Sequence, residues 1–225
     1  MIERDYILRI INDLARVLSK VLLHKENKRY DEAQRDMTAA GKLLLGADPA
    51  FLDALSTDEL IRLLRLSDRF DIEKCLLMAE LLRERGEVAM LQQHEAEGVR
   101  GLIRSLTLYL ELHSEFRDTL PKEISLRVSQ LITSLAEFEL PADLQWRLVR
   151  YYELQGQFAR AEDTLFQLLG MDASYYDEAK KFYNRLAVKT DEELERGNLP
   201  REELKSGLAS IEQLFHGTGL RNALK

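Results

Sequence analysis

Hydrophobic residues recur at steps of three and four along the chain, which is the spacing of one face of an α-helix. The first stripe predicts a long helix from near the N-terminus to about His24, built on Ile7, Ile10, Ile11, Leu14, Val17, Leu18, Val21 and Leu22. A short polar break separates it from a second stripe that reaches about Leu45. Because the break is short, the two helices are expected to form a hairpin.

Helix-start signals divide the following sequence into further helices. Ser56, with Glu59 three positions later, has the capping-box pattern, and Asp71 is a suitable N-cap. Pro121 and Pro141 each stand where a first helical turn would begin, a position in which the missing amide of proline is harmless. Each of these four signals therefore predicts the start of a helix.

Three glycines interrupt the central helical pattern. Gly86 is predicted to end a helix in the left-handed conformation, and Gly98 and Gly101 to mark a bend or a close crossing of two helices. No segment shows the alternating pattern of a strand. The predicted fold class is therefore all-α.

The stretch YYELQGQFARAEDTL, residues 151–165, has the packing code of two helices that turn back on each other. Apolar residues face one another across a glycine turn, and a small alanine stands where the helices approach, at Leu148, Tyr152, Gly156, Phe158, Ala161 and Leu165. Together with its flanks, about residues 142–172, the stretch resembles a tetratricopeptide unit. That motif belongs to arrays of stacked helix pairs.

Three other stretches resemble the same unit less fully, at residues 29–37, 78–91 and 175–183. The resemblance implies an irregular tetratricopeptide-like array of antiparallel helix pairs, an α-solenoid.

The array is expected to form one all-helical domain over residues 1–225. A subdivision into residues 1–115 and a tetratricopeptide-like half, residues 116–225, is possible.

The chain as a whole resembles an uncharacterised family of small bacterial helical proteins. The likeness is carried by MIERDY at residues 1–6 and GNLPREEL at residues 197–204. It implies a bacterial cytoplasmic protein and supplies no catalytic residue.

Composition agrees with a cytoplasmic protein. The formal net charge is -7, with 39 acidic and 32 basic residues interspersed, so no broad basic surface is expected for nucleic acid or an anionic membrane. The apolar runs fall far short of the roughly 20 residues that span a bilayer, and the N-terminus lacks the features of a secretion signal. Cys75 is the single cysteine, which excludes an intrachain disulfide and a cysteine metal cluster.

Catalytic and cofactor motifs are absent. The four histidines are scattered, and His94 with Glu97 lacks further ligands, so no metal site is expected. Gly41 and Lys42 lack the remaining residues of a phosphate loop, and Cys75 lies in an apolar helical pattern where an inert thiol is expected. The sequence therefore predicts no catalytic residue, no metal and no cofactor.

A candidate binding surface lies on the first helix of the tetratricopeptide-like unit. Asp143, Trp146, Arg150 and Glu153 share its outward face, which in the family lines a concave groove. An exposed tryptophan beside an arginine suits peptide binding. Alternatively, Trp146 packs against a neighbouring helix pair, as large aromatics commonly do. The lysine and asparagine clamp that holds a terminal carboxylate is absent.

These observations favour a non-enzymatic scaffold that binds a protein or peptide along a helical groove. The alternative is a small-molecule-binding or enzymatic protein with a pocket between the central helices, near His94 and His113.

The N-terminal helix suggests a second kind of partner. Its apolar residues follow two heptad lines, Ile7, Leu14 and Val21 on one and Leu8, Ala15 and Leu22 on the other. A residual apolar stripe there could support a homodimer.

Overall fold

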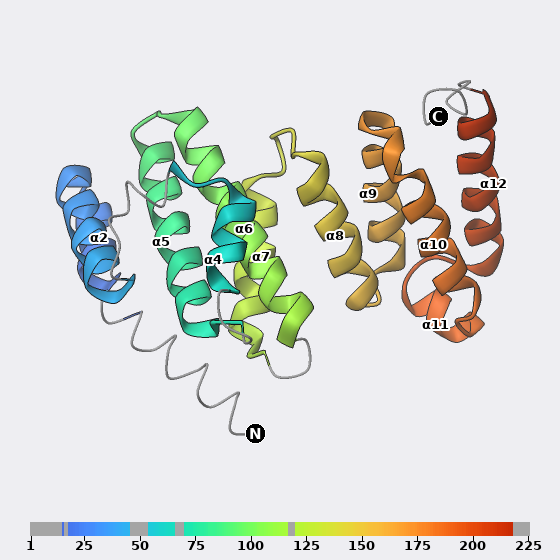
Figure 1. Cartoon of the computed structure of the whole chain (residues 1–225), viewed down its shortest axis with the longest axis horizontal. Coiled ribbons are helices and arrows are strands. Elements are labelled where there is room, and N and C mark those ends of the chain that lie inside the picture. Colours follow the sequence, from blue (N-terminus) through green and yellow to red (C-terminus); the bar gives the residue numbers. More distant parts are fainter. Residues whose placement is uncertain (1–14, 16–17, 46–53, 66–69, 117–119, 218–225) are drawn as a thin grey trace. The chain divides into compact units, whose positions relative to one another are not determined.

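The computed structural model describes residues 15, 18–45, 54–65, 70–116 and 120–217, leaving out the side chains of 44–45 and 215–217 (Figure 1). Throughout these residues the chain forms helices and turns without a strand, which confirms the all-α class. The chain divides into two compact units, residues 1–139 and 140–225. The subdivision considered after residue 115 falls inside the first unit, at the end of a helix.

The first unit begins with the predicted hairpin. Residues 18–26 are helical, and Lys28, with a φ of 57°, turns the chain into α2 (Tyr30–Leu45). Val21 is fully buried, as are Ala33 and Met37 on α2. Because α2 also packs against α5 (Ile72–Leu91), the hairpin is joined to the middle of the unit.

The helix starts lie close to where the sequence places them. Ser56 and Glu59 form the complete capping box of α4 (Thr57–Leu64), and the Asp71 side chain caps α5. Pro121 and Pro141 occupy the N-cap positions immediately before α7 (Lys122–Ser134) and α8 (Ala142–Leu154).

The core of the first unit is the antiparallel pair formed by α5 and α6 (Glu95–Phe116). Residues 75–84 of α5 and 104–113 of α6 are buried at every position. A helix buried on all faces is normally apolar on all faces. These two stretches instead include glutamate, arginine and histidine, whose buried polar groups need hydrogen-bond or ionic partners.

Three glycines allow α5 and α6 to cross closely. A Cβ atom on Gly86 would lie 2.9 Å from the backbone oxygen of Gly98, and one on Gly101 would lie 3.0 Å from Cα of Gly86. The predicted close crossing is therefore confirmed. The prediction that Gly86 ends a helix is wrong, because α5 continues through it to Leu91. Residues 78–91 accordingly form one continuous helix and not a tetratricopeptide-like turn.

The second unit contains the predicted hairpin of α8 and α9 (Phe158–Met171). Gly156 makes the turn with a φ of 70°, where a side chain would be strained. The predicted packing residues Leu148, Tyr152, Phe158, Ala161 and Leu165 are all buried.

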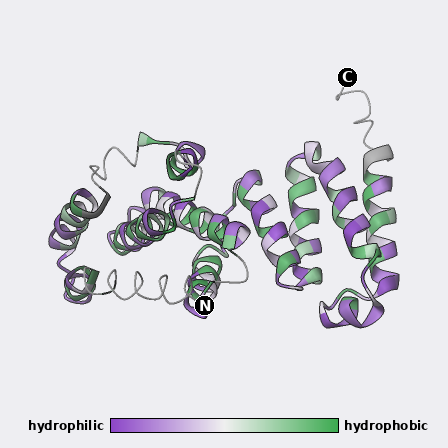
Figure 2. Cartoon of the chain, turned by 60° about the horizontal axis from the view of Figure 1, so that its bottom comes forward, coloured by the Kyte–Doolittle hydropathy of each residue, from purple (hydrophilic) through white to green (hydrophobic). Residues whose placement is uncertain are grey.

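The remaining elements of this unit are η1 (Ala173–Tyr175), α10 (Tyr176–Ala187), α11 (Asp191–Arg196) and α12 (Arg201–Gly217). Figure 2 shows both hydrophobic and hydrophilic positions along these helices. They are therefore amphipathic, with one face available for burial.

The turn between α11 and α12 is fixed to α9 and α10. Gly197 accepts a backbone hydrogen bond from Ala159 at 3.0 Å, and a Cβ there would lie 2.3 Å from the Phe158 ring. Arg201 donates to the backbone oxygens of Ala187 at 2.9 Å and Lys189 at 2.5 Å, which satisfies carbonyls at the end of α10. The GNLPREEL stretch is thus a structural junction.

Candidate functional site

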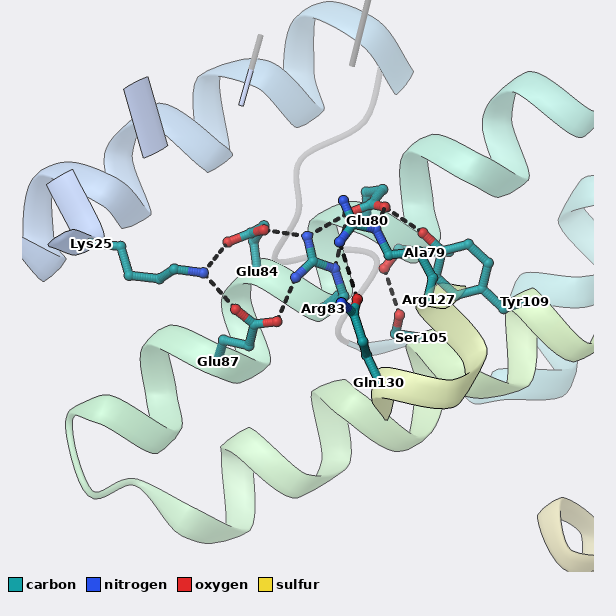
Figure 3. A network of polar contacts seen from close by, with 10 residues as sticks. All are labelled: Lys25, Ala79, Glu80, Arg83, Glu84, Glu87, Ser105, Tyr109, Arg127 and Gln130. Carbon is teal, nitrogen blue, oxygen red and sulfur yellow. Dashed lines mark hydrogen bonds and ion pairs between the residues drawn. The ribbon is translucent and has the colours of Figure 1, made fainter. Parts of the chain in front are cut away.

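A network of charged side chains lies on the buried part of α5 (Figure 3). Glu80, Arg83, Glu84 and Glu87 follow one another at helical spacing, so they share one side of the helix. The Glu84 side chain is only 1% exposed. Lys25, just before the turn into α2, reaches the same side of α5.

Arg83 is the centre of the network. Its guanidinium donates to Glu80 Oε2 from Nε at 3.0 Å and from Nη2 at 2.7 Å, and it also contacts Glu84 and Glu87. Lys25 Nζ lies 2.6 Å from Glu84 Oε2 and 2.5 Å from Glu87 Oε2. Each buried carboxylate therefore has a cationic partner, without which its burial would be costly.

Two further helices complete the surroundings of Glu80. Tyr109 on α6 donates from its hydroxyl to Glu80 Oε1 at 2.6 Å, and Arg127 on α7 donates to the same oxygen from Nε at 3.0 Å. Nearby, Ser105 donates to the backbone oxygen of Ala79 at 2.7 Å. The network thus joins α5 to α6, α7 and the N-terminal hairpin.

Opposite charges outweigh burial in setting the protonation of this network. Burial would raise the pKa of Glu80, but Arg83, Arg127 and the Tyr109 hydroxyl hold it below its ordinary value. Burial would lower the pKa of Lys25, but Glu84 and Glu87 raise it. Burial and the Glu80 carboxylate raise the pKa of Tyr109 well above its ordinary value. Glu80 and Lys25 are therefore held in their charged forms, and Tyr109 is held as a neutral phenol.

A cavity of about 210 Å³ lies beside this network. Its charged lining residues are Glu80, Arg83, Glu84, Glu123 and Arg127, and Tyr109 also lines it. Its apolar lining residues are Ala15, Leu18, Leu22, Leu76, Ile124 and Leu126. The cavity therefore combines apolar and polar lining, as small-molecule sites do.

The residues considered for chemistry do not converge. His94 is exposed at the turn immediately before α6, whereas His113 is buried on α6 nineteen residues later, about 28 Å farther along the helix axis. Burial lowers the pKa of His113 to about 4, so this imidazole is neutral at physiological pH. Neither histidine lines the cavity beside the network.

Within the described ranges, neither the Cys75 thiol nor a metal site provides a reactive centre. Burial raises the pKa of the Cys75 thiol well above its ordinary value, and its sulfur lies 3.6 Å from the backbone oxygen of Leu108. Such a thiol is a poor nucleophile. Among the described residues, no group of three or more His, Cys, Asp or Glu side chains is placed to hold a metal ion.

The predicted binding residues lie along one side of α8 in the second unit. Asp143 and Arg150 are exposed, and neither makes a hydrogen bond or ion pair with another described residue. Trp146 is half-buried, and its ring centroid lies 5.9 Å from that of Tyr175 in η1. Trp146 therefore packs against an aromatic of its own unit while keeping part of its surface open.

Glu153 differs from the other three predicted residues. Its two carboxylate oxygens accept from Arg185 on α10, from Nε at 2.6 Å and from Nη2 at 2.8 Å. A two-pronged pair of this kind fixes both side chains. Glu153 thus joins α8 to α10.

The sequence gives little indication of the network or of the role of Tyr175. Glu80, Arg83 and Glu84 interrupt an otherwise apolar stretch of α5, which is the one sequence signal that they are buried. Nothing local marks Lys25, Tyr109 or Arg127 as their partners, because these residues come from other helices.

Comparison with known proteins gives a family without an assigned role. The model of a family of unknown function, DUF6483, matches residues 1–216. The chain belongs to this family. The match confirms the predicted resemblance to an uncharacterised family, whereas the tetratricopeptide resemblance stays a prediction. No curated protein and no solved structure matches the sequence.

Two further findings concern a membrane and a second copy of the chain as partners. Within the described ranges, no helix is both long and apolar enough to cross a membrane. Of the two heptad lines, Ile7, Leu8 and Leu14 lie outside the described residues. Val21 is buried in the first unit, while Leu22 is 40% exposed.

Proposed function

We propose that this protein is a non-enzymatic scaffold whose tetratricopeptide-like pair, α8 and α9, binds a segment of a partner protein. The observation that carries the proposal is the half-buried Trp146–Tyr175 pair, whose ring centroids lie 5.9 Å apart. Aromatic rings held by packing offer contact area with little loss of side-chain freedom, and tryptophan, tyrosine and arginine dominate the energetics of binding surfaces.

The charges beside the aromatic pair favour a particular ligand chemistry. Arg150 lies one helical turn after Trp146, is exposed, and is not engaged by another described residue. Its guanidinium can hold a carboxylate with two parallel hydrogen bonds. We therefore expect a peptide with an apolar or aromatic side chain against the rings and an acidic residue at Arg150.

Selection from a displayed peptide library tests this proposal with the full chain as bait. Peptides enriched by the native protein should combine an acidic and an apolar residue, and should lose binding to the variant Trp146→Ala with Arg150→Ala. The control is Val188→Ala with Lys205→Ala, which removes an exposed apolar and an exposed basic side chain of the same unit. Equal binding to all three proteins, or no enrichment, would refute the proposal.

A homodimer through the N-terminal helix is the second partner that we propose. It rests on the exposed Leu22 and Leu23, at 40% and 51%. Sedimentation at increasing concentration should show a dimer that Leu22→Glu with Leu23→Glu abolishes.

We also expect a cytoplasmic location, because Cys75 is a buried free thiol.

A further inference from the structure

The cavity beside the ionic network has the form of a small-ligand site that is separate from the surface on α8. It belongs to the first unit, and all its lining residues come from the N-terminal helix, α5, α6 and α7. Its volume of about 210 Å³ can be compared with an apolar protein cavity of about 150 Å³ that binds benzene. The space therefore suits an apolar body of roughly six to eight carbons.

Three apolar residues that line the cavity are also exposed to solvent. Leu22 on the N-terminal helix is 40% exposed, and Leu126 on α7 is 58% exposed. Both line the cavity, as does the exposed Ala15. A ligand that covers these side chains would remove apolar surface from water, which favours binding.

Among the described residues, the charges that line the cavity have an excess of one acid. Glu80, Glu84 and Glu123 line the cavity with Arg83 and Arg127, which gives three negative and two positive charges. Adding Lys25 and Glu87, the other ion partners of this network, adds one charge of each sign and leaves the excess unchanged.

Glu123 is the acid that accounts for the excess. Glu80, Glu84 and Glu87 are each paired with a cation, as described above, whereas Glu123 makes no hydrogen bond or ion pair with another described residue. It lies one turn before Arg127 on α7, and it is exposed at the edge of the cavity. Its carboxylate can accept hydrogen bonds from a cationic group.

We propose that this cavity binds a small apolar amine, with the hydrocarbon body against Ala15, Leu22 and Leu126, its accessible apolar lining, and the ammonium at Glu123. On the neighbouring lining, Glu80 and Glu84 balance the charges of Arg83 and Arg127. A bound carboxylate would therefore meet Glu123, which has no ion partner among the described residues, as a like charge.

The proposal is tested with three probes that share one apolar body and differ in charge. These are 2-phenylethylamine, 2-phenylethanol and 3-phenylpropionate, titrated into the full chain by calorimetry at low salt. We expect saturable binding, with the amine about three- to five-fold tighter than the alcohol, which is the upper part of the range for an exposed ion pair. The carboxylate should be weakest, and added salt should reduce the differences.

Two kinds of variant distinguish the contribution of the Glu123 charge to binding from that of the cavity volume. Glu123→Gln should abolish the preference for the amine over the alcohol, whereas Glu137→Gln, a second exposed acid of the same unit, should leave it unchanged. Ala15→Phe and Leu126→Trp fill the opening from opposite helices, and each should weaken all three probes at least tenfold. Circular dichroism checks that each variant remains folded.

The outcomes are decisive for the site. Absence of saturable binding, equal affinity for the amine and the carboxylate, or binding that survives both filling variants would overturn the proposal. Because the site lies in the first unit, these results are independent of peptide binding at Trp146.

Discussion

The Tyr183 hydroxyl donates a hydrogen bond to Glu162 Oε1 at 2.6 Å inside the second unit. Both side chains are buried, and α12 passes directly over them at Gly207. A Cβ at Gly207 would lie 2.2 Å from Glu162 Oε1 and 2.5 Å from the Tyr183 hydroxyl. The pair therefore links α9 and α10 beneath a helix that approaches only because residue 207 has no side chain.

Tyr183→Phe should destabilise the second unit by about 1–3 kcal/mol, because it leaves the buried Glu162 carboxyl without its donor. Trp146 is the single tryptophan of the chain and lies in this unit, so its fluorescence during urea unfolding reports the loss. Tyr175→Phe removes a hydroxyl from a half-buried tyrosine and should change stability by less than about 0.5 kcal/mol. Equal effects of the two substitutions would contradict this role for the pair.

The second unit should lose stability as the pH rises through the pKa of Glu162. Burial raises this pKa above 4.5, and Glu203 and Asp163 add to the effect, although the hydrogen bond from Tyr183 opposes it. The folded state therefore holds a proton at pH values where the unfolded state has released it. Linkage then requires the free energy of unfolding to fall with increasing pH over that interval.

Glu162→Gln tests the pH dependence directly. The amide oxygen still accepts from Tyr183, but the side chain no longer titrates, so this part of the pH dependence should disappear. Tryptophan-detected urea unfolding across a pH series measures it for both proteins. Glu212→Gln on the exposed side of α12 should retain the native pH profile. A native profile in Glu162→Gln would show that another group is responsible.

The fold was predictable where the relevant interactions are local in sequence. The Ser56–Glu59 capping box and the Asp71 cap depend on residues three positions apart, and both are present. The hairpin around Gly156 combines a glycine turn with apolar residues on the two flanking helices, and it too is present. Each of these patterns has one low-energy local solution.

The ionic network was not predictable, because its energetics depend on helices far apart in the sequence. Charged residues at the spacing of Glu80, Arg83 and Glu84 normally form a solvated helix surface. Here residues 75–84 of α5 are buried at every position, and cations come from 59 positions away at Lys25 and 47 positions away at Arg127. Burial of the charges follows from tertiary packing that no local pattern specifies.

The candidate surface on α8 was only partly predictable for the same reason. Helical spacing placed Asp143 and Arg150 correctly on the exposed side. The partners of the other two residues come from farther along the chain. Trp146 packs against Tyr175 of η1, and Glu153 is bound by Arg185, 32 positions later.

Gly86→Ala should destabilise the first unit by up to about 2 kcal/mol. Its Cβ would meet the Gly98 oxygen at 2.9 Å and the Leu102 nitrogen at 3.0 Å, both backbone atoms, so the two helices must separate. Overpacking costs about 1–3 kcal/mol, offset by about 1 kcal/mol from the better helix propensity of alanine. Urea unfolding followed by circular dichroism measures the difference.

Gly170→Ala is the matched control for the glycine crossing. Gly170 also lies in a helix, α9, but a Cβ there would have no atom within 4 Å. The same substitution should therefore stabilise its helix, by up to about 1 kcal/mol. If Gly86→Ala were stabilising as well, the close approach of α5 and α6 would be incorrect.

A double-mutant cycle on Lys25 and Glu84 should show strong coupling. Lys25→Met leaves Glu84 with Arg83 alone, and Glu84→Gln leaves Lys25 with Glu87 alone, so each single substitution removes one partner from a charge inside the unit. The double variant removes both charges together and should cost less than the sum of the two single variants. Contacting residues in one network typically couple by about 0.5–3 kcal/mol, and burial places this pair in the upper part of that range.

The exposed pair Lys181 and Glu178 supplies the comparison, since it lies within one helix and its side chains are 62% and 39% exposed. The same cycle there should give a coupling of about 0.2–0.5 kcal/mol, which 1 M salt should reduce further. The Lys25–Glu84 coupling should resist salt, because its charges are largely shielded from solvent ions. Additive effects at Lys25 and Glu84 would mean that this ion pair does not hold the N-terminal hairpin on α5.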